Sequence, residues 1–381
     1  MSRKPPNWSG SGATCGPTRC MTRCAGGSIS SATSTSTTVS PPTWRHASAS
    51  TQPTIPDSAE AYMTPQTDWS IIDFHAHVRP SWWQPALPDA SEIDPEERAK
   101  RLERFKKLVD VDLLVRESEE GDVALRLLSS TIEGFFGTEG PTDIGEIRRV
   151  NDFLSNVQSR HAGRLAALAT VDAYAGDVAA REAERAIVEL GHVGIVIDSS
   201  RDQKFLSAPE VRPTLEVAAK HKVPVLVHPV GAPNSDALTR GGGVAAYSFG
   251  RGLVNGAAFF SALKAGIFEQ LPDLHLVFTA IGTGALVIAA AEAEQYSDEA
   301  RAKGNLPNAY FDVMGLNPQT IRYLVDFLGA DRVVAGSDWP IWAPITRSTL
   351  TTAFEKAGLT PGQQKAIAEG NARQLLGLRN T

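Results

Sequence analysis

The sequence predicts an α/β fold, and within that class a (β/α)8 TIM barrel. Eight short apolar runs alternate with longer segments of helical periodicity between residues 70 and 338. The runs are hydrophobic along their length, as in a parallel sheet that is covered on both faces. The sequence has neither a GxGxxG motif after the first run nor a GxxxxGK(S/T) motif, so a doubly wound nucleotide-binding sheet would lack its phosphate loop. Eight βα units over about 310 residues favour the barrel.

The predicted strands are short and rich in Val, Ile, Leu and Ala. Between them, segments such as AAREAERAIVEL and PEVRPTLEVAAKH repeat apolar residues at the spacing of an amphipathic helix. In chain order, the predicted strands are residues 70–76, 123–129, 165–171, 193–198, 224–229, 274–280, 309–314 and 332–338.

Residues 1–62 differ in composition from the rest of the chain. The stretch SSATSTSTTVSPPTW is rich in Ser, Thr and Pro and has no hydrophobic periodicity, which predicts a disordered N-terminal extension. Met63 opens the segment that leads into the first strand. Residues 1–62 are therefore interpreted as an over-called start or a dispensable tail, and residues 63–381 as the barrel.

Composition limits the class of protein. Hydrophobic residues make up 42% of the 381 residues and charged residues 21%, as in ordinary globular proteins, and the net charge is −6. The acidic balance argues against nucleic acid as a partner, and no apolar run is long enough to cross a membrane. All three cysteines lie in the first 25 residues, so the barrel has no disulfide, which suggests a cytoplasmic enzyme. The expected partner is a small-molecule substrate, and a homodimer is an open option.

Four metal-ligand side chains fall at the ends of predicted strands. His75 and His77 close the first strand in IIDFHAH, and residues two apart on a strand point to the same side. His228 closes the fifth strand in VPVLVHP, and Asp338 closes the eighth in VVAGSDWP. The carboxyl ends of barrel strands meet at one face. This pattern predicts one divalent metal site, with Zn²⁺ expected and Mn²⁺ as the alternative.

The chain resembles a known family at these motifs. DFHAH, VPVLVHP, GADRVVAGSDWP and the closing NARQLLGL are similar to the amidohydrolase superfamily, in the branch of aminocarboxymuconate-semialdehyde decarboxylase. The resemblance implies a metal-dependent barrel in which His75, His77, His228 and Asp338 bind one ion. That branch usually places an acid/base histidine at the end of the sixth strand, where this chain has Ala280.

The alanine at position 280 shapes the expected function. Because alanine cannot transfer a proton, we expect hydrolysis of a lactone, ring amide or activated C–C bond in a small, anionic, cyclic or aromatic substrate. A metal-bound water would be the nucleophile and Asp338 its proton acceptor. The alternative is a non-oxidative decarboxylase of an aromatic or muconate-type acid. A third hypothesis is a barrel that binds metal without catalysis.

Other polar side chains are placed by the predicted loops. Glu133, after the second strand, is a second candidate acid/base. Asp312, on the seventh strand, is expected to orient a ligand histidine or to bond the backbone, whereas His161, His192 and His275 are expected to be structural. The candidate substrate-binding residues follow the first and fifth strands, and are Arg79, Trp82, Arg240, Tyr247 and Arg251.

Overall fold

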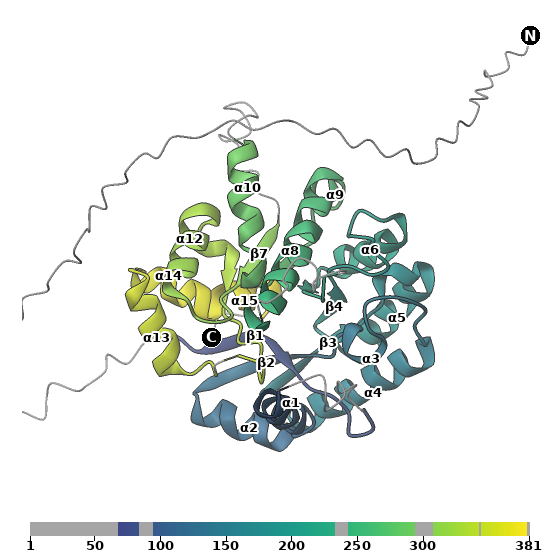
Figure 1. Cartoon of the computed structure of the whole chain (residues 1–381), viewed down its shortest axis with the longest axis horizontal. Coiled ribbons are helices and arrows are strands. Elements are labelled where there is room, and N and C mark those ends of the chain that lie inside the picture. Colours follow the sequence, from purple (N-terminus) through teal and green to yellow (C-terminus); the bar gives the residue numbers. More distant parts are fainter. Residues whose placement is uncertain (1–67, 84–93, 233–242, 294–307, 343, 379–381) are drawn as a thin grey trace, which may run out of the picture. The chain divides into compact units, whose positions relative to one another are not determined.

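The computed structural model describes residues 68–83, 94–232, 243–293, 308–342 and 344–378. These residues form a parallel sheet of eight strands in the order β1 to β8, with helices outside it, and so confirm the predicted TIM barrel (Figure 1). The strands are β1 Ile71–His77, β2 Val123–Ser129, β3 Leu165–Thr170, β4 Gly194–Asp198, β5 Val225–His228, β6 Leu276–Phe278, β7 Ala309–Asp312 and β8 Val333–Val334.

The barrel closes between the first strand and the segment that follows β8. Phe74 donates its backbone N–H to Ala335 at 2.8 Å, and Asp338 donates to the carbonyl of His75, also at 2.8 Å. The last predicted strand, 332–338, is thus shortened to Val333–Val334, because Ala335 donates its N–H to Ile367 instead of a strand neighbour. The sixth is also shorter than predicted, since a 3₁₀ turn, η4 (Ala280–Gly282), begins two residues after Phe278.

Helices follow the strands and cover the outside of the barrel (Figure 1). Helix starts carry the expected polar caps: the Asp94 carboxylate accepts from two backbone N–H groups of α1, and that of Asp143 accepts from one of α4. The helices are α1 Pro95–Leu108, α2 Val111–Glu120, α3 Glu133–Phe136, α4 Ile144–Arg160, α5 Asp177–Val188, α6 Arg212–His221, α8 Gly243–Lys264, α9 Ile267–Gln270, α10 Gly284–Ala293, α12 Pro318–Leu328, α13 Arg347–Lys356, α14 Pro361–Lys365 and α15 Asn371–Leu375. Short 3₁₀ turns are η2 Ala173–Ala175, η3 Pro209–Val211 and η5 Ala330–Arg332, and η6 (Ala366–Gly370) is a π-helical turn.

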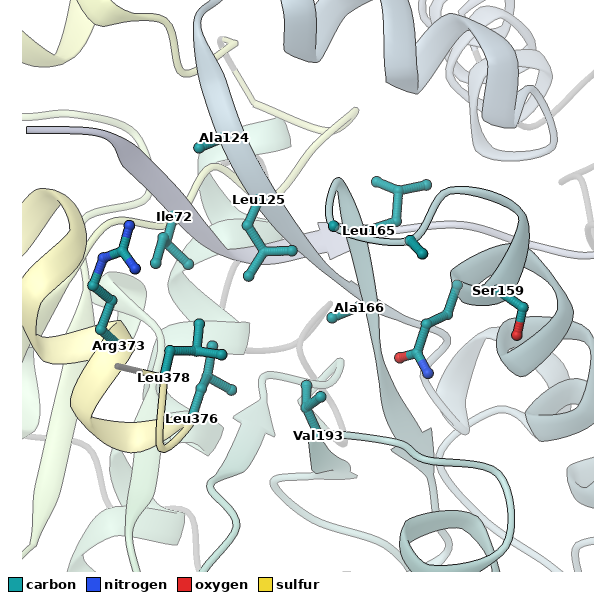
Figure 2. A pocket seen from close by; sticks show the side chains of 13 residues that line it. Ile72, Ala124, Leu125, Ser159, Leu165, Ala166, Val193, Arg373, Leu376 and Leu378 are labelled. Atoms are coloured by element: carbon teal, nitrogen blue, oxygen red, sulfur yellow. The ribbon is translucent and has the colours of Figure 1, made fainter. Parts of the chain in front are cut away.

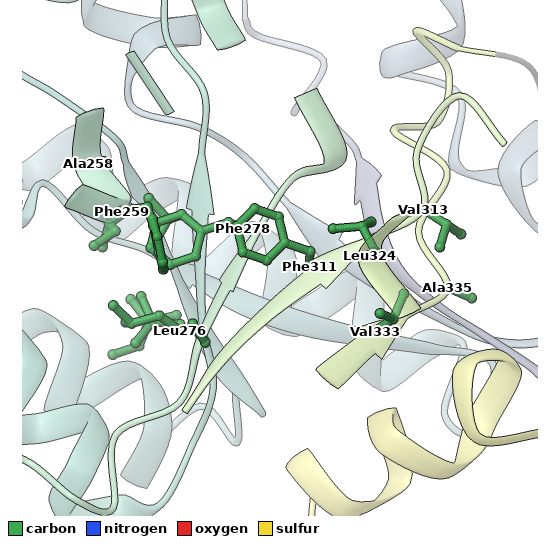
Figure 3. Packing of buried hydrophobic residues seen from close by; sticks show 14 of the residues in the cluster. Ala258, Phe259, Leu276, Phe278, Phe311, Val313, Leu324, Val333 and Ala335 are labelled. Atoms are coloured by element: carbon green, nitrogen blue, oxygen red, sulfur yellow. The ribbon is translucent and has the colours of Figure 1, made fainter. Parts of the chain in front are cut away.

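Two apolar layers hold the barrel together. On its outside, Phe259 of α8 packs edge-on against Phe278 of β6, with ring centroids 5.5 Å apart, and Phe278 stacks on Phe311 of β7 (Figure 3). Inside, a separate buried cluster is built from alternate strand residues that include Ile72, Val196 and Leu226. In β4 and β5 the side chains alternate between the two layers, so the next inward residue lies at the carboxyl end of the strand. β1 departs from this pattern, because its pairing with β2 shifts register between Asp73 and Ala76.

Residues 1–62 lie outside the described residues, so their dispensability stays a prediction. We expect a chain that begins at Met63 to match the full chain in melting temperature and metal content, because a Ser/Thr/Pro-rich segment cannot bury a core. Differential scanning calorimetry and elemental analysis of both chains measure this. A melting temperature that falls by several degrees on truncation would contradict it.

Candidate metal centre and active site

Strand alternation places a ring of polar side chains at the carboxyl end of the barrel. Val196 and Leu226 belong to the interior cluster, and Asp198 and His228 lie two residues further along the same strands. Asp198 and His228 are also direct neighbours in the β4–β5 pairing. The two side chains therefore form adjacent parts of the inner wall, at the face where barrel enzymes have their active sites.

The four predicted metal ligands converge. One nitrogen or oxygen atom from each of His75, His77, His228 and Asp338 lies within 4.8 Å of the others, and all four residues are buried. The three imidazole rings are nearly perpendicular to one another, at interplanar angles of 85–88°. Three imidazoles and one carboxylate, with a side left open, are a typical donor set for a catalytic divalent ion. The residues thus form a single divalent metal site, as the sequence predicted.

Hydrogen bonds set the orientation of two of these rings. His75 Nδ1 lies 2.7 Å from an Asp312 carboxylate oxygen, and His77 Nδ1 lies 2.8 Å from the Ser129 hydroxyl. Each bond occupies the Nδ1 side, so that the Nε2 atoms, 3.2 Å apart, face the common point. The third ring, His228, has an Nδ1 with no hydrogen-bond partner in the described part of the chain.

Asp312 serves both of the roles considered for it. One carboxylate oxygen binds His75, and the other accepts the backbone N–H groups of Ala280 and Met314 at 2.7 and 3.1 Å. Gly336 permits this contact: a Cβ there would lie 2.8 Å from Asp312 Cβ and 3.1 Å from His75 Cβ. These backbone hydrogen bonds therefore hold the Asp312 carboxylate in place independently of its bond to the His75 ring.

We expect Asp312→Asn to weaken metal binding by about 10- to 100-fold, because an amide oxygen is a poorer acceptor for the ring N–H of a ligand histidine. Competition with a metallochromic chelator measures this affinity. Asp326→Asn, on the exposed side of α12, is the control and should leave it unchanged. Equal affinities in all three proteins would show that Asp312 only supports the backbone.

The charges around the histidines differ from ring to ring. For His75, burial lowers the pKa, but the carboxylates of Asp338 and Asp312 outweigh burial and the net pKa is raised. For His77 and His228, burial dominates and the pKa values are lowered, in His228 to well below the usual value. The two rings with lowered pKa values are neutral at pH 7 and have a lone pair for a metal ion.

A buried ion pair positions Asp338. Asp73, in the middle of β1, pairs with Arg126 of β2 and accepts the backbone N–H and hydroxyl of Ser337 at 2.9 and 2.6 Å. Asp338 itself has a left-handed φ of 58°, which is uncommon for a residue with a side chain and is found mainly at functional sites. Sequence analysis did not single out Asp73, although a carboxylate inside an apolar strand was its signal.

Glu133 and Asp198 form a carboxylate pair beside the metal ligands. The Glu133 side chain accepts the N–H of Gly231, after β5, and an N–H of Arg251, both at 2.7 Å. Its backbone N–H donates to Asp198 Oδ2 at 2.7 Å. Asp198 is 3% exposed, its Oδ1 has no partner among the described residues, and burial followed by the charge of Glu133 raises its pKa to about 8. Asp198 is a further residue that sequence analysis did not identify.

The candidate substrate residues after the first strand separate in space. Arg79 is buried, donates to Thr131 Oγ1 at 2.9 Å, and lies over the rings of Trp83 and Phe135. Burial lowers its pKa to about 10, so it is still a cation at neutral pH. Trp82 instead packs on α4, where its indole N–H donates to Glu146 at 2.7 Å, and within the described chain it has no recorded contact with the metal ligands.

The candidates after the fifth strand lie on α8. Arg251 bridges Glu133 and the carbonyl of Pro229, and also donates to the Tyr247 hydroxyl at 3.0 Å. Arg251 is thus near the carboxyl-end opening of the barrel, called the mouth below, but its guanidinium is already hydrogen-bonded within the protein. Tyr247 is more than half exposed. Arg240 lies outside the described residues, so its role stays a prediction.

The sixth strand brings no histidine to the mouth. Ala280 is buried beside Asp312, and His275 lies at the entry of β6, where it contacts Tyr310. His192 is buried, with both ring nitrogens unpartnered in the described chain, and burial lowers its pKa to about 4. His161 ends α4 as its C-cap. These positions agree with the structural roles expected for the three histidines.

A separate hollow lies at the opposite end of the barrel. It has a volume of about 540 Å³ and is lined mainly by aliphatic side chains at the strand entries, such as Ile72 and Leu125, together with Leu376 and Leu378 near the end of the chain (Figure 2). Its arginine, Arg373, pairs with Glu369. This hollow lies at the entry of β1, whereas the metal ligands His75 and His77 lie at the carboxyl end of that strand. Among the described residues, no helix is both long and apolar enough to span a bilayer.

Comparisons with known proteins agree with this site. A family model described as amidohydrolase matches residues 72–378. The chain is 23% identical over 281 residues to 2-amino-3-carboxymuconate-6-semialdehyde decarboxylase from Dictyostelium discoideum, covering 71% of this chain and 77% of that protein. It is 25% identical over 296 residues to gamma-resorcylate decarboxylase from Polaromonas sp., covering 71% and 89%.

A solved structure shares the fold. The 5-carboxyvanillate decarboxylase of Novosphingobium aromaticivorans, complexed with manganese and 4-hydroxy-3-methoxy-5-nitrobenzoic acid, superposes with a TM-score of 0.66 at 18% identity. The match covers 82% of this chain and 97% of that one.

These relatives correct the expected reaction. Hydrolysis was favoured because Ala280 replaces the usual histidine, but the proteins that this chain resembles in sequence are decarboxylases. The prediction of a hydrolase is therefore wrong, and the alternative is supported. The physical reason is that one missing side chain does not decide the chemistry of a site whose carboxylates, Asp338, Glu133 and Asp198, offer other places for a proton.

Proposed function

The chain belongs to the amidohydrolase family, and on this premise we propose that it is a metal-dependent, non-oxidative decarboxylase of an aromatic or muconate-type carboxylic acid. One observation carries the proposal: a mouth with three histidines and one aspartate, in a chain related over 71% of its length to decarboxylases of such acids. The reaction breaks the bond between the carboxylate and its carbon, releases CO₂, and leaves a proton on that carbon.

Asp338 is the residue that we assign to carry this proton. Its Oδ1 is 2.9 Å from His77 Nε2 and 3.5 Å from His75 Nε2, so it lies at the centre of the site. A divalent ion bound there would hold the oxygen atoms of the substrate and withdraw electrons from them. Glu133, the second candidate, has hydrogen bonds to both carboxylate oxygens and is assigned a positioning role instead.

The buried cation of Arg79 supports an anionic substrate. Its guanidinium is enclosed by two aromatic rings and is bonded only to Thr131 within the described chain, so a carboxylate that enters the mouth is attracted to it. Arg251, which pairs with Glu133 at 2.7 Å, is a second, largely buried guanidinium group close by. For the metal we propose Mn²⁺ rather than Zn²⁺. The donor set suits either ion, and the manganese of the structural neighbour supports Mn²⁺.

The test measures two products in parallel. Purified protein, reconstituted with Mn²⁺ or Zn²⁺, is given hydroxybenzoates and carboxymuconate-type acids, and separately lactones and cyclic amides. We expect CO₂ release from at least one acid and no ring opening. Hydrolysis of a lactone or amide without release of CO₂ from any acid would overturn the proposal.

A homodimer is proposed as the assembly. Phe249 and Leu253 of α8 and Val287 and Ile288 of α10 are 47–59% exposed, and the two helices pack against each other. Several large apolar side chains on neighbouring helices are unusual for a free surface, and two copies related by a two-fold axis would cover them. Light scattering after size-exclusion chromatography measures the mass.

A cytoplasmic location also stays a prediction.

A further inference from the structure

Asp198 is a buried carboxylate with one unused oxygen at the wall of the mouth. It is the next inward residue after Val196 and stands beside the metal ligand His228 in the β4–β5 pairing. Its Oδ2 is satisfied by the N–H of Glu133, but Oδ1 has no partner among the described residues. A buried acceptor without a hydrogen bond costs about 1–3 kcal/mol and calls for an explanation.

The charges around Asp198 limit what can pair with it. Glu133 and Arg251 form an ion pair at 2.7 Å, and Arg79 is a second buried cation whose charge is favoured by Asp198 and Glu133. An ammonium group would meet the two guanidinium cations, and a carboxylate would find a hydrogen on Oδ1 only while Asp198 is protonated. A hydroxyl group can donate to Oδ1 or accept from it, so it can pair with Asp198 in either protonation state.

A second buried group close to Asp198, the cation of Arg79, can hold the carboxylate of the same substrate. Arg79 has an unpartnered, buried Nε and lies 5.0 Å from the ring centre of Phe135. Gly134 leaves room for it, since a Cβ there would be 2.1 Å from a guanidinium nitrogen. Glu133 and Gly134 are consecutive, so one turn of α3 holds Asp198 by its N–H and packs against Arg79.

We propose that Asp198 is a specificity-determining residue, whose Oδ1 forms a hydrogen bond with a hydroxyl group on the ring of the substrate. The choice of an aromatic acid as the substrate rests on the proposed decarboxylase function. The binding test of Asp198 does not depend on that function. The substrate is then a hydroxylated aromatic acid, and an acid without the hydroxyl leaves Oδ1 unpaired.

The experiment compares pairs of acids on the metal-loaded protein. The probes are the monohydroxybenzoates and benzoate, which lacks the hydroxyl group. Calorimetry gives Kd, and CO₂ release reports turnover. For one hydroxybenzoate isomer we expect the wild type to bind the hydroxylated acid at least about 10-fold more tightly than benzoate. In Asp198→Ala this ratio should fall to within about 3-fold.

Asp172→Asn is the matched control. Asp172 is also buried and follows the end of β3, but its oxygens bond Tyr174 and Thr142, so its replacement should affect both acids alike and leave the ratio unchanged. A general structural role of Asp198 would likewise weaken both acids and preserve the ratio. The proposal would be overturned by that result, by equal binding of both acids in the wild type, or by a failure to bind any hydroxybenzoate. Preferential binding without CO₂ release would instead refute the decarboxylase function and leave the assignment of Asp198 intact.

Discussion

Removal of the divalent ion should reduce CO₂ release to background, and His75→Ala/His77→Ala should contain no metal after purification. The double substitution takes away two of four donors, and the remaining His228 and Asp338 come from strands that lie apart in the barrel. We expect the wild type to hold about one ion per chain and to regain activity when Mn²⁺ is returned after chelation. The double variant should regain none. Elemental analysis and a CO₂-coupled assay provide both readouts.

The matched control removes two histidines elsewhere. His161 caps α4, and His221 near the end of α6 pairs with Glu184 on the surface, so His161→Ala/His221→Ala should keep both metal and activity. Circular dichroism should show the same barrel in all three proteins, since its closure depends on backbone bonds between β1 and the segment after β8. Full metal content in the His75/His77 variant would place the ion elsewhere.

Two local rules predicted much of the metal centre. His75 and His77 share a side because of the pleat, and His228 joins them because all parallel strands end at one face. Neither rule told which side of β1 the histidines take: Ile72 lies in the interior cluster, and the β1–β2 pairing shifts register between Asp73 and Ala76. The same reasoning could have identified Asp198, which ends VGIVID as His228 ends PVLVHP. It was overlooked because an aspartate at a strand end also suits an ordinary turn.

Contacts between distant segments could not be predicted in this way. Glu133 accepts from Gly231, 98 residues away, and Asp73 accepts from Ser337, 264 residues away. Such pairs depend on where loops cross the mouth, which no local pattern encodes. The same limit explains why hydrolysis was predicted wrongly. Ala280 was visible in the sequence, but the carboxylates that surround the mouth could be identified only from the folded structure.

Asp338→Asn should lower CO₂ release by about 10²- to 10⁴-fold while much of the metal is retained. Asparagine keeps the shape of the side chain and an oxygen that can face the ion, and the N–H from Asp338 to His75 that closes the barrel is unaffected. What is lost is a carboxylate able to carry a proton at the centre of the site. Asp331→Asn, on the exposed η5 turn, removes a carboxylate close by in sequence and should change nothing.

The amount of metal separates the possible causes in this variant. If activity falls in proportion to metal content, Asp338 acts only as a ligand, and the proton belongs to another group. If activity falls far below the metal content, as we expect, Asp338 carries the proton. A variant with full metal and more than about one tenth of wild-type activity would refute the assignment, because the loss of a positioned acid/base costs at least about 10²-fold. Asp198 would then be the next carboxylate to test, since its buried Oδ1 has no hydrogen-bond partner among the described residues.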